Sequence, residues 1–328
     1  MVTLEETDLC FPQLLNSSCR KPIRPHFETM LIYILLSFIA LLTAALNLLV
    51  IISISHFKQL HTPTNLLLLS LAVSDFFVGL LMFFQIILID GCWFLGDLMC
   101  TLYYFLDYIL TSTSVGTMVL ISVDRYVAIC HPLHYSTKIT VKGVALCTCL
   151  CWVCSALYNN LIMNNNLKQP GRYNTCIGQC VIVIDHVAGL VDLFLTFIGP
   201  VTVIVVLYMR VFVVAVSQAR AMRSHIAVVN IQCSVKVTKK SELKAAGTLG
   251  VVIVVFLLCL CPYFCLTLTG QDTMLNASSA AFVICLFYFN SCLNPLIYTF
   301  FYPWFRKSVQ VIVTLQILKP DSSKINIL

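Results

Sequence analysis

The sequence predicts an all-α membrane protein, a seven-transmembrane helix bundle with a short amphipathic eighth helix. Of its 328 residues, 59% are hydrophobic and only 10% are charged, whereas about one quarter of the residues in soluble domains are charged. Apolar runs close to the ~20 residues that cross a bilayer recur along almost the whole chain. Because these runs leave no room for a sizeable soluble domain, we expect one membrane domain.

Hydropathy places the membrane spans at about 30–55, 66–89, 98–130, 144–162, 187–216, 245–269 and 280–301. The predicted organisation is an extracellular N-terminal tail over 1–29, a transmembrane domain over 30–302, and an amphipathic helix with a cytoplasmic tail over 303–328. The N-terminal tail carries charged residues and lacks the short apolar core of a secretory signal, so no removable signal peptide is expected. The first span would then act as the insertion signal.

The distribution of positive charge predicts the orientation of the bundle. Of the 20 Lys and Arg residues, the N-terminal tail and the loops on its side carry Arg20, Lys21, Arg24, Lys168 and Arg172. The others fall on the opposite side, so the positive-inside rule places the N-terminus outside the cell. The net charge of +6 also predicts attraction to anionic membrane lipid, and no nucleic-acid-binding motif accompanies it.

Two N-glycosylation sequons begin at Asn16 and Asn276. Both fall on the predicted outer side, as modification in the secretory lumen requires. Their agreement supports the orientation that the charges predict.

Most of the 17 cysteines lie within apolar spans, where we expect small packing residues. Cys100, at the outer start of the third span, and Cys176 and Cys180, in the second outer loop, face an oxidising compartment in which disulfides persist. We expect a Cys100–Cys180 bridge. Cys176 then needs a partner, and the N-terminal tail offers Cys19, which we favour, and Cys10. Zinc binding is the competing interpretation, but no tight Cys/His spacing supports it.

Asp75, Asp107 and Asp192 lie within the spans, and each indicates a functional site because ionised groups are costly in hydrocarbon. Asp75 lies in the middle of the second span. The side chains whose oxygens could complete a hydrated sodium site with it are Ser114, Asn290, Ser291 and Asn294. The alternative is a hydrogen-bonded network without an ion. Apart from this sodium ion, no cofactor or metal is expected.

Three motifs mark the third, sixth and seventh spans. Asp124-Arg125-Tyr126 ends the third span, where a charged pair can rearrange when a partner docks. Pro262 interrupts the sixth span, and Asn294-Pro295-Leu296-Ile297-Tyr298 ends the seventh. Together with the Leu-Ala-Val-Ser-Asp run that ends at Asp75, these motifs resemble the rhodopsin-like G-protein-coupled receptors over nearly the full length.

The run over 290–305, Asn-Ser-Cys-Leu-Asn-Pro-Leu-Ile-Tyr-Thr-Phe-Phe-Tyr-Pro-Trp-Phe, resembles more narrowly the trace amine-associated receptors, an olfactory branch of the aminergic receptors. The pair of Cys176 and Cys180 with a spare N-terminal cysteine is similar to that family too. The resemblance implies a plasma-membrane receptor of olfactory sensory neurons that binds amines. It also implies coupling to a heterotrimeric G protein of the stimulatory or olfactory type, which raises cyclic AMP.

The same resemblance implies that Asp107 forms a salt bridge with the ligand ammonium and that Tyr288 orients this acid by hydrogen bonding. Tyr108, Tyr263 and Phe264 offer aromatic walls that would attract an ammonium by cation–π interaction, although Phe264 could equally be a packing residue. Thr111 is optional pocket lining, because Ser and Thr often bond back to their own helix.

Asp192 lies two helical turns above Pro200, at the level where catecholamine-type receptors carry serines. Acids on the third and fifth spans that face one cavity predict a diamine ligand such as cadaverine or putrescine, with about five methylenes, because a monoamine leaves one buried carboxylate unpaired. One alternative is a protonated Asp192 hydrogen-bonded to Thr196 or to the second outer loop. The other is a monoamine receptor that uses only Asp107 or only Asp192.

The sixth span departs from the family pattern at Leu260, two residues before Pro262, where most rhodopsin-like receptors carry Trp. That indole usually links pocket occupancy to movement of the sixth helix. We expect Phe256 to carry more of this role here.

Other function classes lack their sequence signatures. An enzyme is not expected, because neither a Ser/His/Asp arrangement nor a His-Glu-x-x-His run is present. A secondary transporter would more often show paired interrupted helices from an internal repeat. The seventh span has no lysine that could form the Schiff base of a retinal pigment.

Overall fold

The computed structural model describes residues 9–14, 16–21, 25–226, 250–251, 253–265, 277–320 and 322–327. Five helical segments are long and apolar enough to cross a membrane: α1 (His26–His56), α2 (Pro63–Asp90), α3 (Asp97–Cys130), α5 (Val141–Ile162) and the segment His186–Ser217. The helix Ile253–Cys265 and α10 (Ala277–Phe301) fall in the two remaining predicted spans. The predicted helical membrane bundle is confirmed, because each predicted span overlaps one of these segments.

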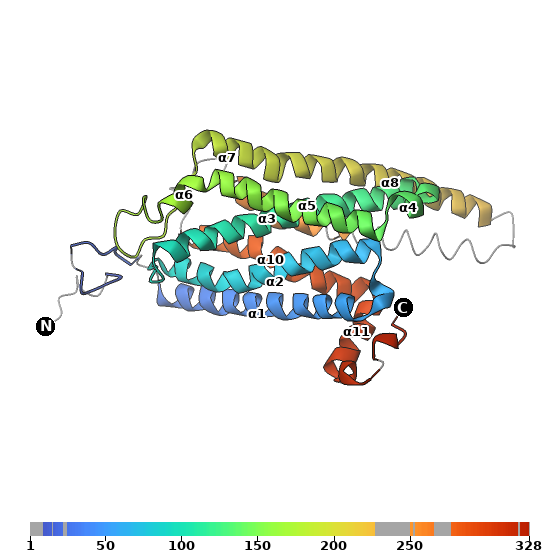
Figure 1. The fold of residues 1–328 in the computed structure, drawn as a ribbon, viewed down its shortest axis with the longest axis horizontal. Coiled ribbons are helices and arrows are strands. Elements are labelled where there is room, and N and C mark those ends of the chain that lie inside the picture. The colour runs from blue at the N-terminus through green and yellow to red at the C-terminus, as the bar shows by residue number, and fades with distance from the viewer. Residues whose placement is uncertain are drawn as a thin grey trace.

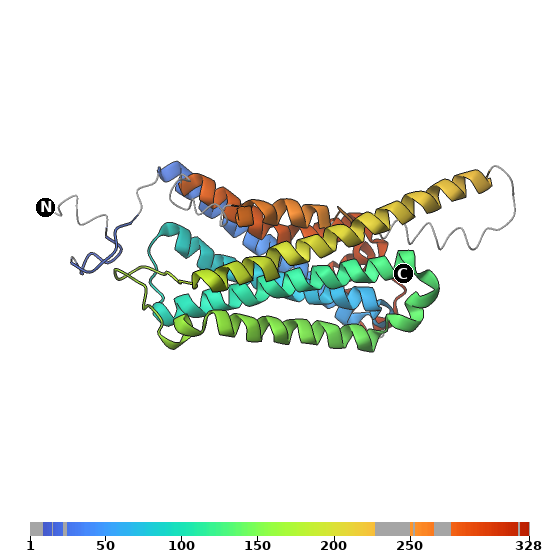
Figure 2. The same ribbon diagram turned by 90° about the horizontal axis from the view of Figure 1, so that it is seen from above.

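The long helices lie side by side with their axes roughly aligned (Figures 1 and 2). Residues 9–14 and 16–21 lie at one end of the bundle, which we call the disulfide end. The short helices α4 (Pro132–Lys138) and α11 (Pro303–Val313) lie at the other, the Arg125 end. The segment α7 (His186–Leu193), η2 (Phe194–Ile198) and α8 (Gly199–Ile226) runs the whole length and continues past the bundle at the Arg125 end (Figure 2).

Local sequence signals fix where several helices begin. Thr62 precedes Pro63 and accepts a 3.2 Å hydrogen bond from Asn65 N, which caps α2. Thr140 caps α5 in the same way through Gly143 N at 3.1 Å. Gly91 ends α2 with φ of 85°, a left-handed conformation that glycine adopts without strain.

The bundle packs through small and apolar residues while much of its apolar surface faces outward. Gly79 of α2 approaches α1 so closely that an added Cβ would lie 2.9 Å from Ala44 N and 3.2 Å from Ala40 O. Small residues at such contacts let membrane helices approach each other. In α5, only Val144, Ser155 and Asn159 are buried. Its apolar outer face suits contact with lipid chains.

The helix α11 is amphipathic, as its sequence predicts. Trp304, Phe305 and Val311 are buried against the bundle, whereas Arg306 and Lys307 are exposed. The chain turns by 95° between the helix 282–298 and α11. This geometry suits a helix that lies along the membrane interface.

Beyond α11 the tail returns to the loop between α1 and α2. The ring of His56 lies 3.0 Å from Ser322 Oγ, and Gln59 Nε2 donates to Ile325 O at 2.8 Å. The Ile327 side chain is fully buried in the same apolar cluster as Phe57 and Leu60. The last described residues therefore pack as part of the folded bundle.

Three disulfides join the chain at the disulfide end. Cys100–Cys180 and Cys19–Cys176 are the two pairs that the sequence favoured. The third, Cys10–Cys92, was missed because Cys92, just past the end of α2, was not considered as a partner. Of the two predicted glycosylation sites, Asn16 is exposed and lies between Cys10 and Cys19 in the chain, and Asn276 lies outside the described residues.

Backbone hydrogen bonds reinforce these bridges. Cys19 N donates to Ile177 O at 2.9 Å, and Trp93 N donates to Gly178 O at 2.8 Å. Gly178 has φ of +101°, and an added Cβ would lie 3.1 Å from Cys10 Cβ and 3.2 Å from the Phe11 ring. The second loop at this end thus requires glycine at position 178 both for conformation and for space.

We expect Gly178→Ala to destabilise the folded protein by about 1–3 kcal/mol, because the left-handed backbone and the contact with Cys10 both disfavour a side chain. The detergent-solubilised protein should melt several degrees lower in a thermal unfolding assay. Gly189→Ala is the matched control, because nothing lies within 4 Å of its added Cβ. Equal melting temperatures for the two variants would contradict the strained-loop interpretation.

Candidate functional site

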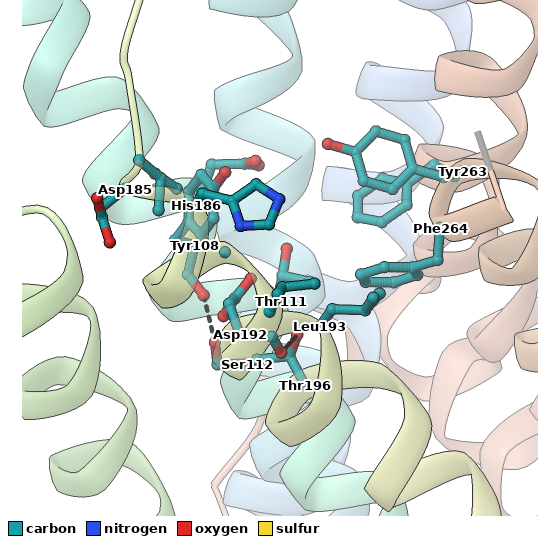
Figure 3. A pocket seen from close by; sticks show the side chains of 15 residues that line it. Tyr108, Thr111, Ser112, Asp185, His186, Asp192, Leu193, Thr196, Tyr263 and Phe264 are labelled. Carbon is teal, nitrogen blue, oxygen red and sulfur yellow. Dashed lines mark hydrogen bonds between the residues drawn. The ribbon is translucent and has the colours of Figure 1, made fainter. Parts of the chain in front are cut away.

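A cavity of about 460 Å³ opens between α3, α7, the helix Ile253–Cys265 and α10 towards the disulfide end. It brings together seven of the eight predicted ligand-binding residues: Asp107, Tyr108, Thr111, Asp192, Thr196, Tyr263 and Phe264. Figure 3 labels all of these except Asp107 around this space. Tyr288, the eighth, does not line the cavity but contacts Asp107 from behind.

Asp107 is held by a chain of hydrogen bonds behind the cavity wall. The Tyr288 hydroxyl donates to Asp107 Oδ1 at 3.2 Å and lies 3.1 Å from the Tyr103 hydroxyl. Tyr103 in turn donates to Gln85 Oε1 of α2 at 2.5 Å. The predicted contact between Tyr288 and Asp107 is therefore present, and sequence reasoning missed Gln85, which extends it into α2.

Asp192 accepts a hydrogen bond from a residue that the sequence did not single out. The Tyr158 hydroxyl of α5 donates to Asp192 Oδ1 at 3.2 Å. Thr196, which we considered as the partner of the Asp192 carboxyl, donates instead to the Asp192 backbone oxygen at 2.7 Å. The contact between Thr196 and the Asp192 carboxyl was therefore wrong, because a Thr hydroxyl four residues on in a helix reaches the backbone carbonyl more readily.

The aromatic side chains form one wall of the cavity. Phe264 stacks on Phe197 with ring centroids 4.3 Å apart, and Tyr263 packs against Phe287 at 4.8 Å. Phe264 is buried yet also lines the cavity, so it combines the two roles that sequence reasoning left open. A wall of aromatic faces opposite carboxylates suits an organic cation.

The segment before α7 also reaches the cavity, which sequence reasoning did not anticipate. Ile184 and Asp185, and His186 at the first position of α7, contribute to its lining. Asp185 is exposed and caps α7 by accepting a 3.2 Å hydrogen bond from Val187 N. An Asp directly before an apolar helical run is a capping signal, and it could have placed the start of α7 at this cavity.

A second polar cluster surrounds Asp75 deeper in the bundle. Ser291 Oγ donates to Asp75 Oδ1 at 2.8 Å, and Asn294 Nδ2 donates to Oδ2 at 2.9 Å. Ser114 contacts Ser74 Oγ at 2.8 Å. The Oδ1 atoms of Asn290 and Asn294 are buried without a hydrogen-bond partner among the described residues. Unpartnered oxygens one helical turn apart, near a carboxylate, are compatible with a hydrated cation.

At the Arg125 end, Asp124 and Arg125 form an ion pair within α3. Thr64 Oγ1 and the Tyr135 hydroxyl donate to the Asp124 carboxylate at 2.9 Å and 2.8 Å. Burial raises the pKa of Tyr135, which lies in α4, so its hydroxyl remains a donor at neutral pH. Tyr126 packs beside Ile129 and Val211. The predicted charged pair of α3 is thus held by hydrogen bonds from α2 and α4.

The residues predicted to link the two ends lie in the core. Phe256 and Leu260 are buried in one apolar cluster with Phe264. Pro262 lies within the helix Ile253–Cys265, and the next residue, Tyr263, both lines the cavity and packs against this cluster. Tyr298 is buried, and its ring lies 6.0 Å from that of Tyr302. A continuous packed path therefore runs from the cavity into the middle of the bundle.

Comparison with known proteins shows which family this chain resembles. The model of the 7 transmembrane receptor (rhodopsin family) matches residues 46–298. Trace amine-associated receptor 13c of Danio rerio is 38% identical over 98% of this chain and 97% of its own length. Trace amine-associated receptor 8a of Rattus norvegicus is 38% identical over 97% of this chain and 96% of its own length. Trace amine-associated receptor 4 of Mus musculus is 37% identical over 97% of this chain and 94% of its own length.

Proposed function

Because the chain belongs to the trace amine-associated receptors of the rhodopsin family, and is therefore a multi-pass plasma-membrane receptor and not an enzyme, we propose that its ligands are diamines. The observation that carries this proposal is one cavity lined by two half-buried carboxylates, Asp107 of α3 and Asp192 of α7, besides the exposed Asp185 that caps α7. Cadaverine and putrescine carry an ammonium at each end and could neutralise both acids.

The energetic argument rests on burial. Asp107 and Asp192 are half-buried, so each carboxylate gains from a counter-charge. Removing one partner of a fully buried pair typically costs about 3–5 kcal/mol, which is the upper limit for these two acids. A monoamine bound at Asp107 leaves Asp192 with the Tyr158 hydroxyl, a neutral hydrogen-bond donor, in place of a counter-ion. A diamine offers a second ammonium to Asp192, so it should bind more tightly than a monoamine of equal chain length.

The proposal includes the direction of signalling. A receptor of this family couples to a heterotrimeric G protein, and we assign a stimulatory or olfactory type that raises cyclic AMP in olfactory sensory neurons. The excess of Lys and Arg on the loops of the Arg125 end supports a cytoplasmic location for that end. The disulfide end would then be extracellular, with glycans at Asn16 and Asn276.

We also assign a sodium ion to the Asp75 cluster in the resting receptor. Asp75, Ser291 and Asn294 would hold it with the Oδ1 atom of Asn290, while Ser114 would contribute through Ser74. The ion would satisfy oxygens that are otherwise buried without partners among the described residues.

The decisive experiment is a cyclic-AMP dose–response in transfected cells with unbranched diamines of increasing length and their matched monoamines. We expect the wild type to prefer the medium-length diamine, and Asp192→Ala to weaken that response by about 100-fold, somewhat less than the loss of a fully buried charge pair predicts. Pentylamine should be nearly unaffected by the substitution. Equal potency of diamines and monoamines on the wild type would support the monoamine alternative instead.

A further inference from the structure

The two carboxylates of the cavity are held in the same way from opposite sides. Tyr288 of α10 donates to Asp107 Oδ1, and Tyr158 of α5 donates to Asp192 Oδ1, both at 3.2 Å. In each case the tyrosine comes from a neighbouring helix and does not line the cavity, while the acid does. Because each hydroxyl engages Oδ1, the second oxygen of each acid, Oδ2, is the one suited to an ammonium.

We propose that Tyr158 is a positioning residue that fixes the Asp192 carboxylate and thereby sets the length of diamine that the receptor prefers. This inference rests on the proposed function, because it concerns the second of the two acidic sites. Tyr158 acts through Asp192 and does not touch the ligand.

The local structure explains why Asp192 needs such support. No residue of α7 is buried, and Asp192 is followed closely by η2, the wider π-helical turn over Phe194–Ile198. A helix segment with little burial constrains its side chains weakly. A hydrogen bond from another helix is then the main restraint on the orientation of this carboxylate.

The helix that carries Tyr158 is itself anchored beside the cavity. Asn159, the next residue, is fully buried, and its Nδ2 donates to Ser112 Oγ of α3 at 3.1 Å. Ser112 lines the cavity, and Figure 3 shows Asp192 close to Ser112 and Tyr108. Adjacent residues of α5 therefore contact both acid-bearing walls, Tyr158 on the α7 side and Asn159 on the α3 side. This places Asp192 at a fixed position relative to α3.

A fixed separation of two acids predicts a sharp optimum in ligand length, because each added methylene moves the second ammonium by about 1.3 Å, the advance of one bond along an extended chain of ~1.5 Å bonds. Without the Tyr158 hydroxyl, Asp192 can change rotamer and follow shorter or longer ligands. The potency should then depend less sharply on the length of the diamine, while the charge of Asp192 remains.

The test uses Tyr158→Phe, which removes one oxygen and keeps the ring. We expect the potency of the best diamine to fall about tenfold, as for loss of one hydrogen bond to a charged group. Diamines that are one methylene shorter or longer should then be about as potent as the best one. Pentylamine potency should stay within about twofold. A purely structural defect would lower both classes of ligand together, so the ratio of diamine to monoamine potency separates the two causes.

Tyr173→Phe in the loop before Cys176 is the matched control, and surface labelling of every variant reports folding. If Asp192→Ala abolishes diamine preference while Tyr158→Phe keeps the sharp length optimum, this inference alone is wrong. If the wild type shows no diamine preference, or Asp192→Ala keeps it, the proposed function fails and the inference falls with it.

Discussion

Asp107→Asn is expected to remove the response to every amine, diamine or monoamine, by at least about 100-fold. The substitution keeps the size of the side chain but removes the charge that an ammonium needs inside the cavity, where an unpaired ion costs several kcal/mol. The Tyr288 hydroxyl can still donate to the remaining side-chain oxygen of the amide, so the fold around α3 and α10 should persist. Cyclic-AMP dose–response curves, normalised to surface expression, measure the effect.

Asp185→Asn is the control for this charge change. Asp185 lines the same cavity, but it is exposed and engaged as the cap of α7. An exposed charge contributes little because water screens it, so potency should change less than about threefold. A similarly small change for Asp107→Asn would refute the assignment of Asp107 as the primary cation partner.

The second large effect is expected from Gly79→Val, which should reduce the amount of folded receptor at the cell surface to about one tenth or less. The added Cβ would meet backbone atoms of Ala44 and Ala40, which cannot rotate away as a side chain could. Separating α1 from α2 by enough to fit valine should cost about 1–3 kcal/mol or more. Surface labelling against total protein measures the loss.

Leu80→Val tests whether position or residue type is responsible. Leu80 is the next residue of α2 but is 40% exposed on the outer face. Its shortening should leave surface expression close to that of the wild type. A normal surface level for Gly79→Val would mean that the two helices can separate without loss, contrary to the close contact described above.

The helical bundle and the lining of the cavity followed from the sequence because their signals are local or chemical. Long apolar runs predict spans wherever they occur, and an acid such as Asp107 or Asp192 inside a span indicates a site by its cost alone. The residue type was therefore enough to find both carboxylates before their common cavity was known.

The partners of these acids were harder to predict, because a hydrogen bond between helices depends on rotation and tilt that no local pattern encodes. Tyr158 lies 34 positions before Asp192 in the chain. No local pattern in the sequence of α5 distinguishes Tyr158 from the other uncharged residues of this helix. The Cys10–Cys92 bridge was missed for a different reason, because Cys92, just past the end of α2, was not considered as a partner.

The return of the tail to the loop between α1 and α2 affects how this receptor can be labelled. A fluorescent protein joined close behind Ile327 would adjoin a side chain that is fully buried. A bulky neighbour there would pull Ile327 away from the apolar cluster of Phe57 and Leu60. Reporter fusions should therefore carry a long flexible Gly/Ser linker, whose random-coil behaviour lets the tail stay docked while the reporter moves freely.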